Sequence, residues 1–359
     1  MRAGLHVNDD RGIADAVAYC AEVQPAAMKW MDPKADTLIA CRRASPKTRH
    51  IIRTHWSDQT LERYPSFINA NLDRLRGLLA HPELRPDADG PVLWVEGYNE
   101  HVTKDTSTSY IRDFAGKEVK LAKAVNALGA GCLMGGCSTG FLEEVHLHAF
   151  KEVLDYCQAN PKAAGFHTHE YAGPYVQYMW NTPGGRDQWT HPGGPWTGWS
   201  ANREAYYTAG LWGWLTLRFV RILPLLQANG WGNVWLAITE SGCDDTPPRP
   251  GPAGNGWMDF DNAEWAGGPV GDFADQMHCY LWQISHHKQV RFVVDFGYGS
   301  IDERWKRFDL ARRPDMLARM KARMRELPIG HFGDVVLPTP LPPTQPDPRP
   351  APVPIPRPA

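Results

Sequence analysis

The sequence predicts one α/β domain in which eight strands and eight helices alternate and close into a (β/α)8 TIM barrel, followed by a Pro-rich tail. A short apolar segment followed by an amphipathic stretch recurs eight times. The chain has 359 residues, of which 43% are hydrophobic, and a barrel of this kind needs about 250 residues. Several apolar segments also end in polar residues, and a parallel barrel gathers its functional groups at its strand ends.

Each predicted strand is a short run rich in apolar and β-branched residues, and each predicted helix has apolar residues at helical spacing. The predicted strands cover residues 5–7, 26–30, 50–55, 92–95, 131–134, 164–171, 234–239 and 290–294. The predicted helices cover residues 13–23, 35–43, 67–79, 110–128, 144–157, 204–227, 272–286 and 314–327. No sequence repeat is detectable between the eight units.

Two predicted connections are longer than usual, at residues 172–200 and 244–271, and both follow predicted strands. Long loops inside a compact domain tend to be functional, and in a barrel these two would lie on the catalytic face. The first loop carries Trp180 and three further tryptophans. Flat amphipathic rings in such a loop can stack on sugars or other ligands.

The composition changes to a Pro-rich run from Leu337, and the chain is divided into a barrel at residues 1–330 and a Pro-rich tail or linker at residues 331–359. The tail is expected to be extended and disordered, because it has too few apolar side chains to form a core. It is either a terminal tail or a linker to a further module.

Composition excludes several classes of protein. The net charge of −2 creates no overall field that attracts nucleic acid or an anionic membrane, and no apolar run reaches the about 20 residues that span a bilayer. Seven cysteines without a Cys-x-x-Cys pair indicate free thiols. No signal peptide precedes the first strand, which predicts a cytoplasmic protein as written. Extracellular action would need non-classical release or cell lysis.

Two carboxylates stand out because each follows a buried strand of similar build. The fourth predicted strand runs out into Asn99 and Glu100, and the seventh runs out into Glu240. The sixth predicted strand, between them in the chain, ends in His169 and Tyr171. Strands four and seven lie on opposite sides of a barrel mouth, so the two carboxylates can act on one substrate together.

These residues belong to three short motifs that resemble those of clan A retaining glycoside hydrolases. Glu96-Gly-Tyr-Asn99-Glu100 resembles the signature at the end of strand four, and His169-Glu-Tyr171 resembles the His-x-Tyr of strand six. Ile238-Thr-Glu240-Ser-Gly242 resembles the nucleophile signature of strand seven. The three occur in the order of the clan with barrel-like spacing, within residues 4–327. No individual family is identified.

The resemblance implies a retaining glycoside hydrolase that acts on a β-linked oligosaccharide or polysaccharide without a cofactor or metal. Glu100 would be the acid/base and Glu240 the nucleophile, two carboxyl groups about 5–5.5 Å apart. Asn99 would bind the sugar 2-hydroxyl, and Tyr171 would bond Glu240. The other side chains expected to contact substrate are His169, Arg53, His55, Trp30 and Trp180.

The chain departs from the clan pattern at three places. Lys29 stands where the clan often has Arg, and Arg53 is the candidate replacement. Tyr98 stands where Trp is usual, and Asp295-Phe296 follows the eighth strand, which ordinarily ends in an aromatic residue. These departures bear on the substrate more than on the mechanism.

Three other acids occur at or near strand ends. Glu96 is expected to support the site structurally, because a buried ionised carboxylate needs a partner, and Arg53 is the candidate partner. Glu170 and Asp295 are spare acids that could tune the catalytic pair.

Two other functions stay open. His167-x-His169 together with Asp295 resembles the ligand set of a metal-dependent, amidohydrolase-like barrel. That class, however, carries its His-x-His on strand one, where this chain has none. The other alternative is a non-catalytic glycan-binding barrel, against which the presence of both Glu100 and Glu240 argues.

Overall fold

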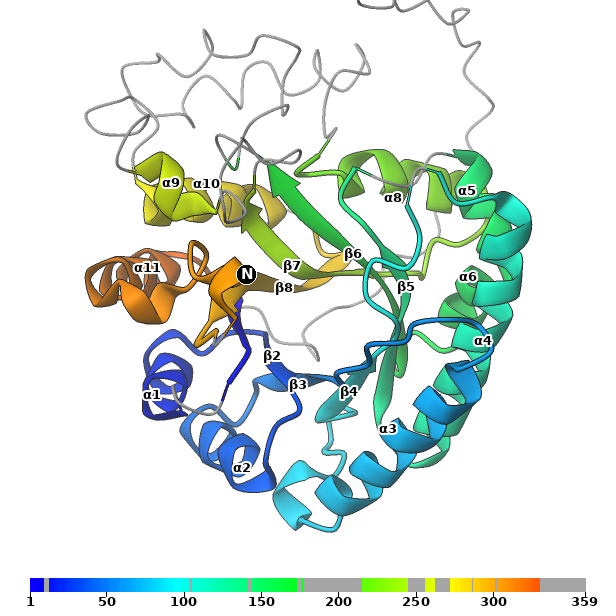
Figure 1. The fold of residues 1–359 in the computed structure, drawn as a ribbon, viewed down its shortest axis with the longest axis horizontal. Coiled ribbons are helices and arrows are strands. Elements are labelled where there is room, and N and C mark those ends of the chain that lie inside the picture. The colour runs from blue at the N-terminus through cyan, green and yellow to red at the C-terminus, as the bar shows by residue number, and fades with distance from the viewer. Residues whose placement is uncertain are drawn as a thin grey trace, which may run out of the picture.

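A computed structural model of the chain shows a closed barrel of eight parallel strands in sequence order, with helices around its outside (Figure 1). The predicted (β/α)8 fold is therefore confirmed. The residues that the structure describes are 1–9, 13–103, 105–140, 144–172, 176, 215–244, 256–261, 272–285, 287–300 and 302–329. Trp180 and the Pro-rich tail lie outside these ranges.

The elements alternate along the chain as the sequence predicts. The strands are β1 Gly4–Val7, β2 Ala27–Met31, β3 Arg49–Arg53, β4 Leu93–Glu96, β5 Gly131–Cys137, β6 Ala164–Ala172, β7 Leu236–Cys243 and β8 Val290–Tyr298. The helices are α1 Ile13–Val23, α2 Ala35–Ala44, α3 Tyr64–Leu79, α4 Thr108–Ala127, α5 Glu144–Ala149, α6 Lys151–Ala159, α8 Phe219–Ala228, α9 Trp257–Asp261, α10 Phe273–Ile284 and α11 Pro314–Glu326. Short 3-10 turns include η2 Pro82–Leu84, η4 Glu303–Trp305 and η5 Leu310–Arg312.

Two predicted helices differ from the structure for identifiable reasons. The predicted helix 144–157 is two helices, α5 and α6, which meet at the fully buried Phe150. The ring of Phe150 packs edge-on against that of Phe166 on β6, with ring centroids 5.3 Å apart. The described part of the predicted helix 204–227 begins only at α8, because Leu217 has a left-handed backbone with φ of 57°. The predicted loop 244–271 also contains α9.

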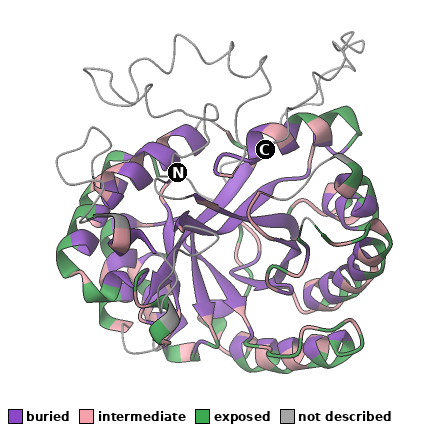
Figure 2. Cartoon of the chain, turned by 45° about the horizontal axis from the view of Figure 1, so that its top comes forward, coloured by how far each residue is buried: buried purple, intermediate pink, exposed green. Residues whose placement is uncertain are grey.

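The main apolar core fills the layer between the strands and the surrounding helices. The strands are buried on both faces, whereas the helices expose their outer faces (Figure 2). This is the expected pattern for a parallel sheet covered by helices. All seven cysteines lie in the described residues, where they are buried and none forms a disulfide bond. None of the helices in the described ranges combines the length and apolar character that crossing a bilayer requires.

The barrel interior has an apolar floor with a polar layer above it. Trp94, Trp235 and Phe292 pack edge to face on the floor, with ring centroids 5.3–5.5 Å apart. Successive inward positions on a strand are two residues apart. Two residues beyond Ala27, Ile51 and Trp94 of the floor, the strands carry the charged side chains of the polar layer, Lys29, Arg53 and Glu96.

We expect Gly131→Ala to destabilise the protein, because Gly131 leaves room for the floor. A Cβ atom at Gly131 would lie 2.3 Å from Cε3 of Trp94, and the indole is enclosed by its neighbours. Overpacking of this kind typically lowers the free energy of unfolding by about 1–3 kcal/mol. Urea denaturation followed by circular dichroism measures the change.

The control is Gly77→Ala on the exposed side of α3. A Cβ atom at Gly77 meets nothing within 4 Å, and Ala is the better helix former by about 0.8–1 kcal/mol. This variant should be as stable as the wild type or more stable. If both alanines changed the free energy of unfolding equally, the packing account of Gly131 would be wrong.

Candidate active site

Glu240, near the C-terminal end of β7, is the most heavily bonded carboxylate of the polar layer. Its Oε1 accepts hydrogen bonds from Lys29 Nζ and Arg53 Nη1, each at 2.9 Å. Its Oε2 accepts a hydrogen bond from the Tyr171 hydroxyl, also at 2.9 Å. The bond between Tyr171 and Glu240 is the one that the family resemblance implies. One oxygen of Glu240 therefore accepts hydrogen bonds from two cations, and the other accepts its hydrogen bond from a neutral phenol.

These partners keep Glu240 ionised. Burial by itself would raise the pKa of this carboxyl, but the positive charges of His169, Lys29 and Arg53 outweigh burial. They hold the pKa well below its usual range. Opposite charges within a few ångströms act this way because they favour the charged form of the acid. Glu240 thus carries a full negative charge at neutral pH in a largely enclosed site.

His169 brings the second carboxylate close to Glu240. Its Nδ1 lies 3.1 Å from Glu100 Oε1 and 3.5 Å from Glu240 Oε2. The two oxygens can therefore be no farther apart than these two distances laid end to end. This upper limit lies at the lower edge of the roughly 6.5–9.5 Å that separates the two carboxyl groups in inverting glycosidases. If the two oxygens and Nδ1 do not lie on one straight line, the oxygens are closer together, toward the roughly 5–5.5 Å of retaining enzymes.

The loop after β3 holds Glu100 in place. Glu100 has a left-handed backbone with φ of 43°, a conformation that costs a non-glycine residue roughly 1–3 kcal/mol. The N–H of Asn99 donates to Gln59 Oε1 at 2.9 Å, and the Tyr98 hydroxyl donates to the Thr60 carbonyl at 3.2 Å. These two bonds fix the backbone on the N-terminal side of Glu100. The side chain of Glu100 is 41% exposed, so it can reach a substrate.

The ring of Tyr98, the residue that stands where the clan usually has Trp, is buried. It packs against Tyr64 and Phe67 of α3, with ring centroids 4.5 Å and 4.7 Å away. The carboxylate of Glu118 on α4 lies beside this cluster, where it accepts from the Tyr64 hydroxyl and from Gly135 N–H. The segment that carries Glu100 is therefore anchored in the helix layer.

Lys29, and not Arg53, is the partner of Glu96. Lys29 Nζ lies 2.7 Å from Glu96 Oε2, and both side chains are fully buried. The sequence-based expectation of Arg53 is wrong in this respect, because the Arg53 guanidinium reaches Glu240 instead. The structural role expected of Glu96 fits its position, since it offsets the charge of a lysine that also bonds Glu240.

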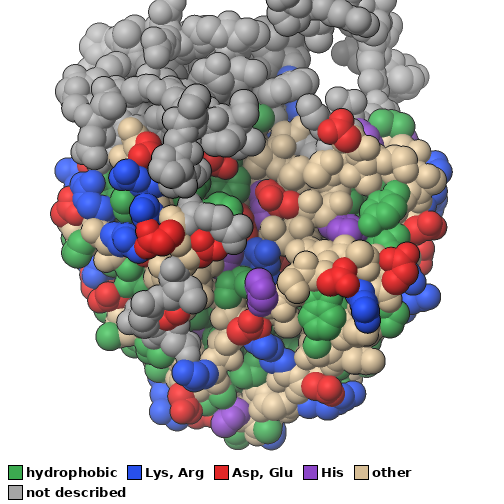
Figure 3. All heavy atoms as spheres, viewed as in Figure 1, with side chains coloured by type: hydrophobic (Ala, Val, Ile, Leu, Met, Phe, Trp, Pro, Cys, Tyr) green, Lys and Arg blue, Asp and Glu red, His purple; other side chains and the backbone are tan. Residues whose placement is uncertain are grey.

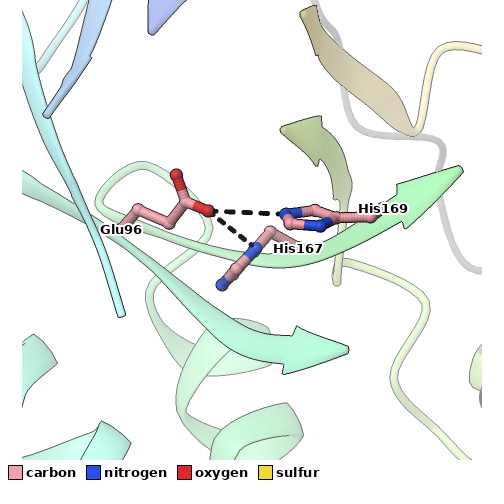
Figure 4. Close-up of side chains that lie close together, drawn as sticks. All are labelled: Glu96, His167 and His169. Carbon is pink, nitrogen blue, oxygen red and sulfur yellow. Dashed lines mark ion pairs between the residues drawn. The ribbon is translucent and has the colours of Figure 1, made fainter. Parts of the chain in front are cut away.

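His169 is the third cation of the site. Burial would lower its pKa, but the carboxylates of Glu240, Glu100 and Glu96 outweigh burial and raise the pKa to about 9. Figure 4 shows the Glu96 carboxylate facing the rings of both His169 and His167. With Lys29, Arg53 and His169 charged, three cations face three carboxylates.

Glu96, His167 and His169 each place one ligand atom within 4.8 Å of the others, which is the geometry of a metal site. The proton positions do not fit one. His167 Nε2 accepts a hydrogen bond from Gly136 N–H at 3.0 Å, and burial lowers the pKa of His167 to about 3. The neutral ring must then carry its proton on Nδ1, the atom that faces Glu96. No lone pair is left there for a metal.

Asp295 does not join the two histidines either. Its carboxyl accepts from Ser241 Oγ at 3.1 Å, and burial raises the pKa of Asp295 to about 8. The ligand set that the sequence suggested for a metal-dependent hydrolase is therefore not assembled, because Asp295 and Phe296 are adjacent in β8 and point to opposite faces.

Glu170 also points away from Glu100 and Glu240. It accepts hydrogen bonds from Leu217 N–H at 2.7 Å and from the Tyr280 hydroxyl at 2.7 Å. It also bonds Phe219 N–H at the start of α8. Glu170 thus caps a helix and does not tune Glu240, contrary to the role considered from the sequence.

Two of the expected substrate contacts lie elsewhere. Trp30 is 2% exposed on the outer face of β2, where its Nε1 donates to His50 Nδ1 at 3.1 Å. It cannot meet a substrate at the mouth. His55 lies exposed on the loop after β3, and its backbone N–H faces the Asp32 carboxylate at 3.3 Å. The described residues show no contact between the His55 ring and either catalytic carboxylate.

The structure adds two site residues that sequence reasoning missed. His6 on β1 is 1% exposed, and its Nδ1 lies 3.5 Å from Glu240 Oε1. Phe296 at the end of β8 points inward, with its ring 5.2 Å from His6 and 6.1 Å from Tyr171 between centroids. A polar residue inside an apolar strand, as at His6, was the available signal. In the space-filling view, acidic, basic and histidine side chains lie close together near the centre (Figure 3).

Comparison with known proteins does not assign a function, so the assignment depends on the geometry of the chain itself. No family model matches the sequence, and no curated protein matches it. A broad-specificity endoglucanase from Clostridium cellulovorans superposes with a TM-score of 0.47 at 10% identity, covering 90% of this chain and 93% of that one. A β-1,3-glucanase of Cryptomeria japonica pollen gives 0.46 at 13% identity, covering 86% and 95%. A Streptomyces mannanase gives 0.41 at 11% identity, covering 93% and 87%.

The charge of His169 can be tested directly by nitrogen-15 NMR of the imidazole rings. His169 is expected to titrate with a pKa of about 9, and Glu240→Gln should lower that pKa because it removes a carboxylate. The folded pKa exceeds the unfolded value of about 6.5. The stabilisation from this charge is therefore complete below about pH 6.5 and is lost as the pH rises through about 9.

His167 is the internal control in the same spectra, because it should stay neutral down to about pH 3. A titration of His169 at or below pH 6.5 would contradict the three-carboxylate environment described for it.

Proposed function

We propose that the chain is a retaining glycoside hydrolase that cleaves a β-linked glycan, with Glu240 as nucleophile and Glu100 as acid/base. The observation that carries the proposal is the bridging position of His169 Nδ1, 3.1 Å from Glu100 and 3.5 Å from Glu240. The upper limit that it sets on the separation of the two oxygens lies near the spacing at which one carboxylate can attack the sugar directly, and this supports the proposal. An inverting mechanism needs room for a water molecule between sugar and base.

The first step forms a covalent intermediate. Glu240 Oε2 attacks the anomeric carbon, while Oε1 stays bonded to Lys29 and Arg53. Oε2 is the freer oxygen, because its one hydrogen bond comes from the neutral Tyr171. The glycosidic carbon–oxygen bond breaks as Glu100 gives its proton to the departing oxygen. The leaving group departs as an alcohol, and the sugar becomes an ester of Glu240.

The second step releases the sugar. Glu100, now ionised, takes a proton from water, and the water oxygen attacks the anomeric carbon. The ester bond breaks and the electron pair returns to Glu240. Lys29, Arg53 and His169 stabilise the carboxylate that reappears, so they make Glu240 a good leaving group. Two inversions at one carbon give net retention.

Asn99 offers a polar atom for the substrate in this mechanism. Its Oδ1 is buried and has no hydrogen-bond partner among the described residues. A buried acceptor without a partner costs free energy, and a sugar hydroxyl would supply the missing donor. This supports the role that the resemblance implies for Asn99, a contact to the sugar 2-hydroxyl.

Glu240→Gln should abolish turnover with little change of fold, because the amide has the shape of the carboxylate but cannot form the ester. In Glu240→Ala, sodium azide should restore activity on aryl glycosides and give a glycosyl azide of inverted configuration. Product configuration by proton NMR is the measurement.

Glu83→Gln on the exposed turn η2 is the matched control and should behave as wild type. If the wild-type chain bound glycans but released no sugar from any aryl glycoside or polysaccharide tested, the chain would be a glycan-binding barrel and the proposed function would be wrong.

Glu100→Ala should separate substrates by leaving group. Loss of a general acid slows catalysis by roughly 10²–10⁴-fold, and the loss should apply to alkyl glycosides and natural glycans. Activated aryl glycosides need little protonation, so their first step should be nearly unaffected. The ratio of kcat/KM between a dinitrophenyl and a methyl glycoside reports the effect. An equal loss on both substrates would remove Glu100 from the acid role.

A further inference from the structure

We infer that Trp305 forms a sugar-binding subsite on the glycone side of the cleavage point, an inference that rests on the proposed function. Trp305 lies in η4, in the segment that follows β8. Segments after strands lie on the C-terminal face of a barrel, where Glu100 and Glu240 also lie. Trp305 is 39% exposed, whereas the barrel tryptophans Trp94 and Trp235 are buried.

A series of ring contacts connects Trp305 to the catalytic pair. The ring of Tyr171, which bonds Glu240, lies 6.1 Å from that of Phe296, and Phe296 lies 5.3 Å from Trp305. Phe308 contacts both rings, with its centroid 5.9 Å from that of Trp305 and 5.4 Å from that of Phe296. Phe296 and Phe308 thus hold the indole in position. Phe296 lies between the indole and the place that the first sugar ring would take. A fixed, partly exposed indole suits the apolar face of a sugar.

The strand order decides which end of the substrate Trp305 meets. In the closed barrel, β4 and β8 are four strands apart in either direction, so they lie on opposite sides. The leaving group must lie beside the acid that protonates it, which is Glu100 at the end of β4. The remainder of the glycan extends away from the leaving group, toward β8. Trp305 therefore faces the second sugar on the glycone side and not the leaving group.

The neighbouring strand β1 connects this aromatic series to the proposed nucleophile a second time. The ring of His6 on β1 lies 5.2 Å from that of Phe296, and His6 Nδ1 lies 3.5 Å from Glu240 Oε1. Phe296, on which Trp305 packs, is therefore fixed beside Glu240. The substrate class that follows is a chain with at least two sugars before the cleaved bond.

The test compares kcat/KM for paired substrates with one leaving group, 4-nitrophenyl β-glucoside against 4-nitrophenyl β-cellobioside and the corresponding mannose pair. In the wild type, one disaccharide should be preferred. Trp305→Ala should lower the disaccharide-to-monosaccharide ratio by roughly tenfold, the size of one lost aromatic contact. Trp305→Tyr should restore part of the ratio, because it returns a ring.

Ile329→Ala is the matched control. Ile329 is 42% exposed but follows Leu327, whose carbonyl bonds Arg2 ahead of β1, on the opposite end of the barrel. The disaccharide-to-monosaccharide ratio of Ile329→Ala should equal that of the wild type. If the wild type hydrolysed these substrates and Trp305→Ala had the same disaccharide-to-monosaccharide ratio as the wild type, the subsite would be overturned and the proposed function would stand. A wild type that hydrolyses neither pair nor any polysaccharide would overturn both.

Discussion

The bond between Lys29 and two carboxylates, Glu96 and Glu240, is the interaction on which the candidate site depends. The two carboxylates, one fully and one largely buried, share one ammonium group. Removing one partner from such a set leaves an uncompensated buried charge, which typically costs about 3–5 kcal/mol. Each charge therefore holds the others in place. The same balance keeps Glu240 ionised and adds His169 as a cation beside Glu100.

The barrel can tolerate these charges because its interior is divided along the strands. The aromatic floor of Trp94, Trp235 and Phe292 closes one end, and the charges begin two residues farther along each strand. Water is excluded from below, which strengthens every electrostatic interaction above the floor. The floor in turn requires Gly131 and Gly165, whose missing side chains leave space for the two indoles. Apolar packing thus determines the depth at which the charges lie.

The sequence predicted the fold and the carboxylate pair, because strand periodicity and ordered motifs are local signals. It did not reveal which face each side chain takes. Trp30 adjoins Lys29, so the two point to opposite faces, and only the contacts of Lys29 with Glu96 and Glu240 identify it as the inward one. The same alternation of side chains along a strand turns Glu170 away from the barrel interior, because its neighbours His169 and Tyr171 face inward. Contacts such as Trp305 on Phe296 depend on how a loop folds back, which no local pattern specifies.

His169 offers a physical reason for the two tasks of Glu100 in the proposed mechanism. Before the reaction, Glu100 holds the proton that it will donate, and the imidazolium between the two groups balances part of the charge of Glu240. When the ester forms, Glu240 loses its charge, and the His169 cation is left facing Glu100. The negative charge that Glu100 acquires on giving up its proton is then stabilised at the moment when a base is needed. One histidine thereby couples the loss of charge on the nucleophile to the change of Glu100 from acid to base.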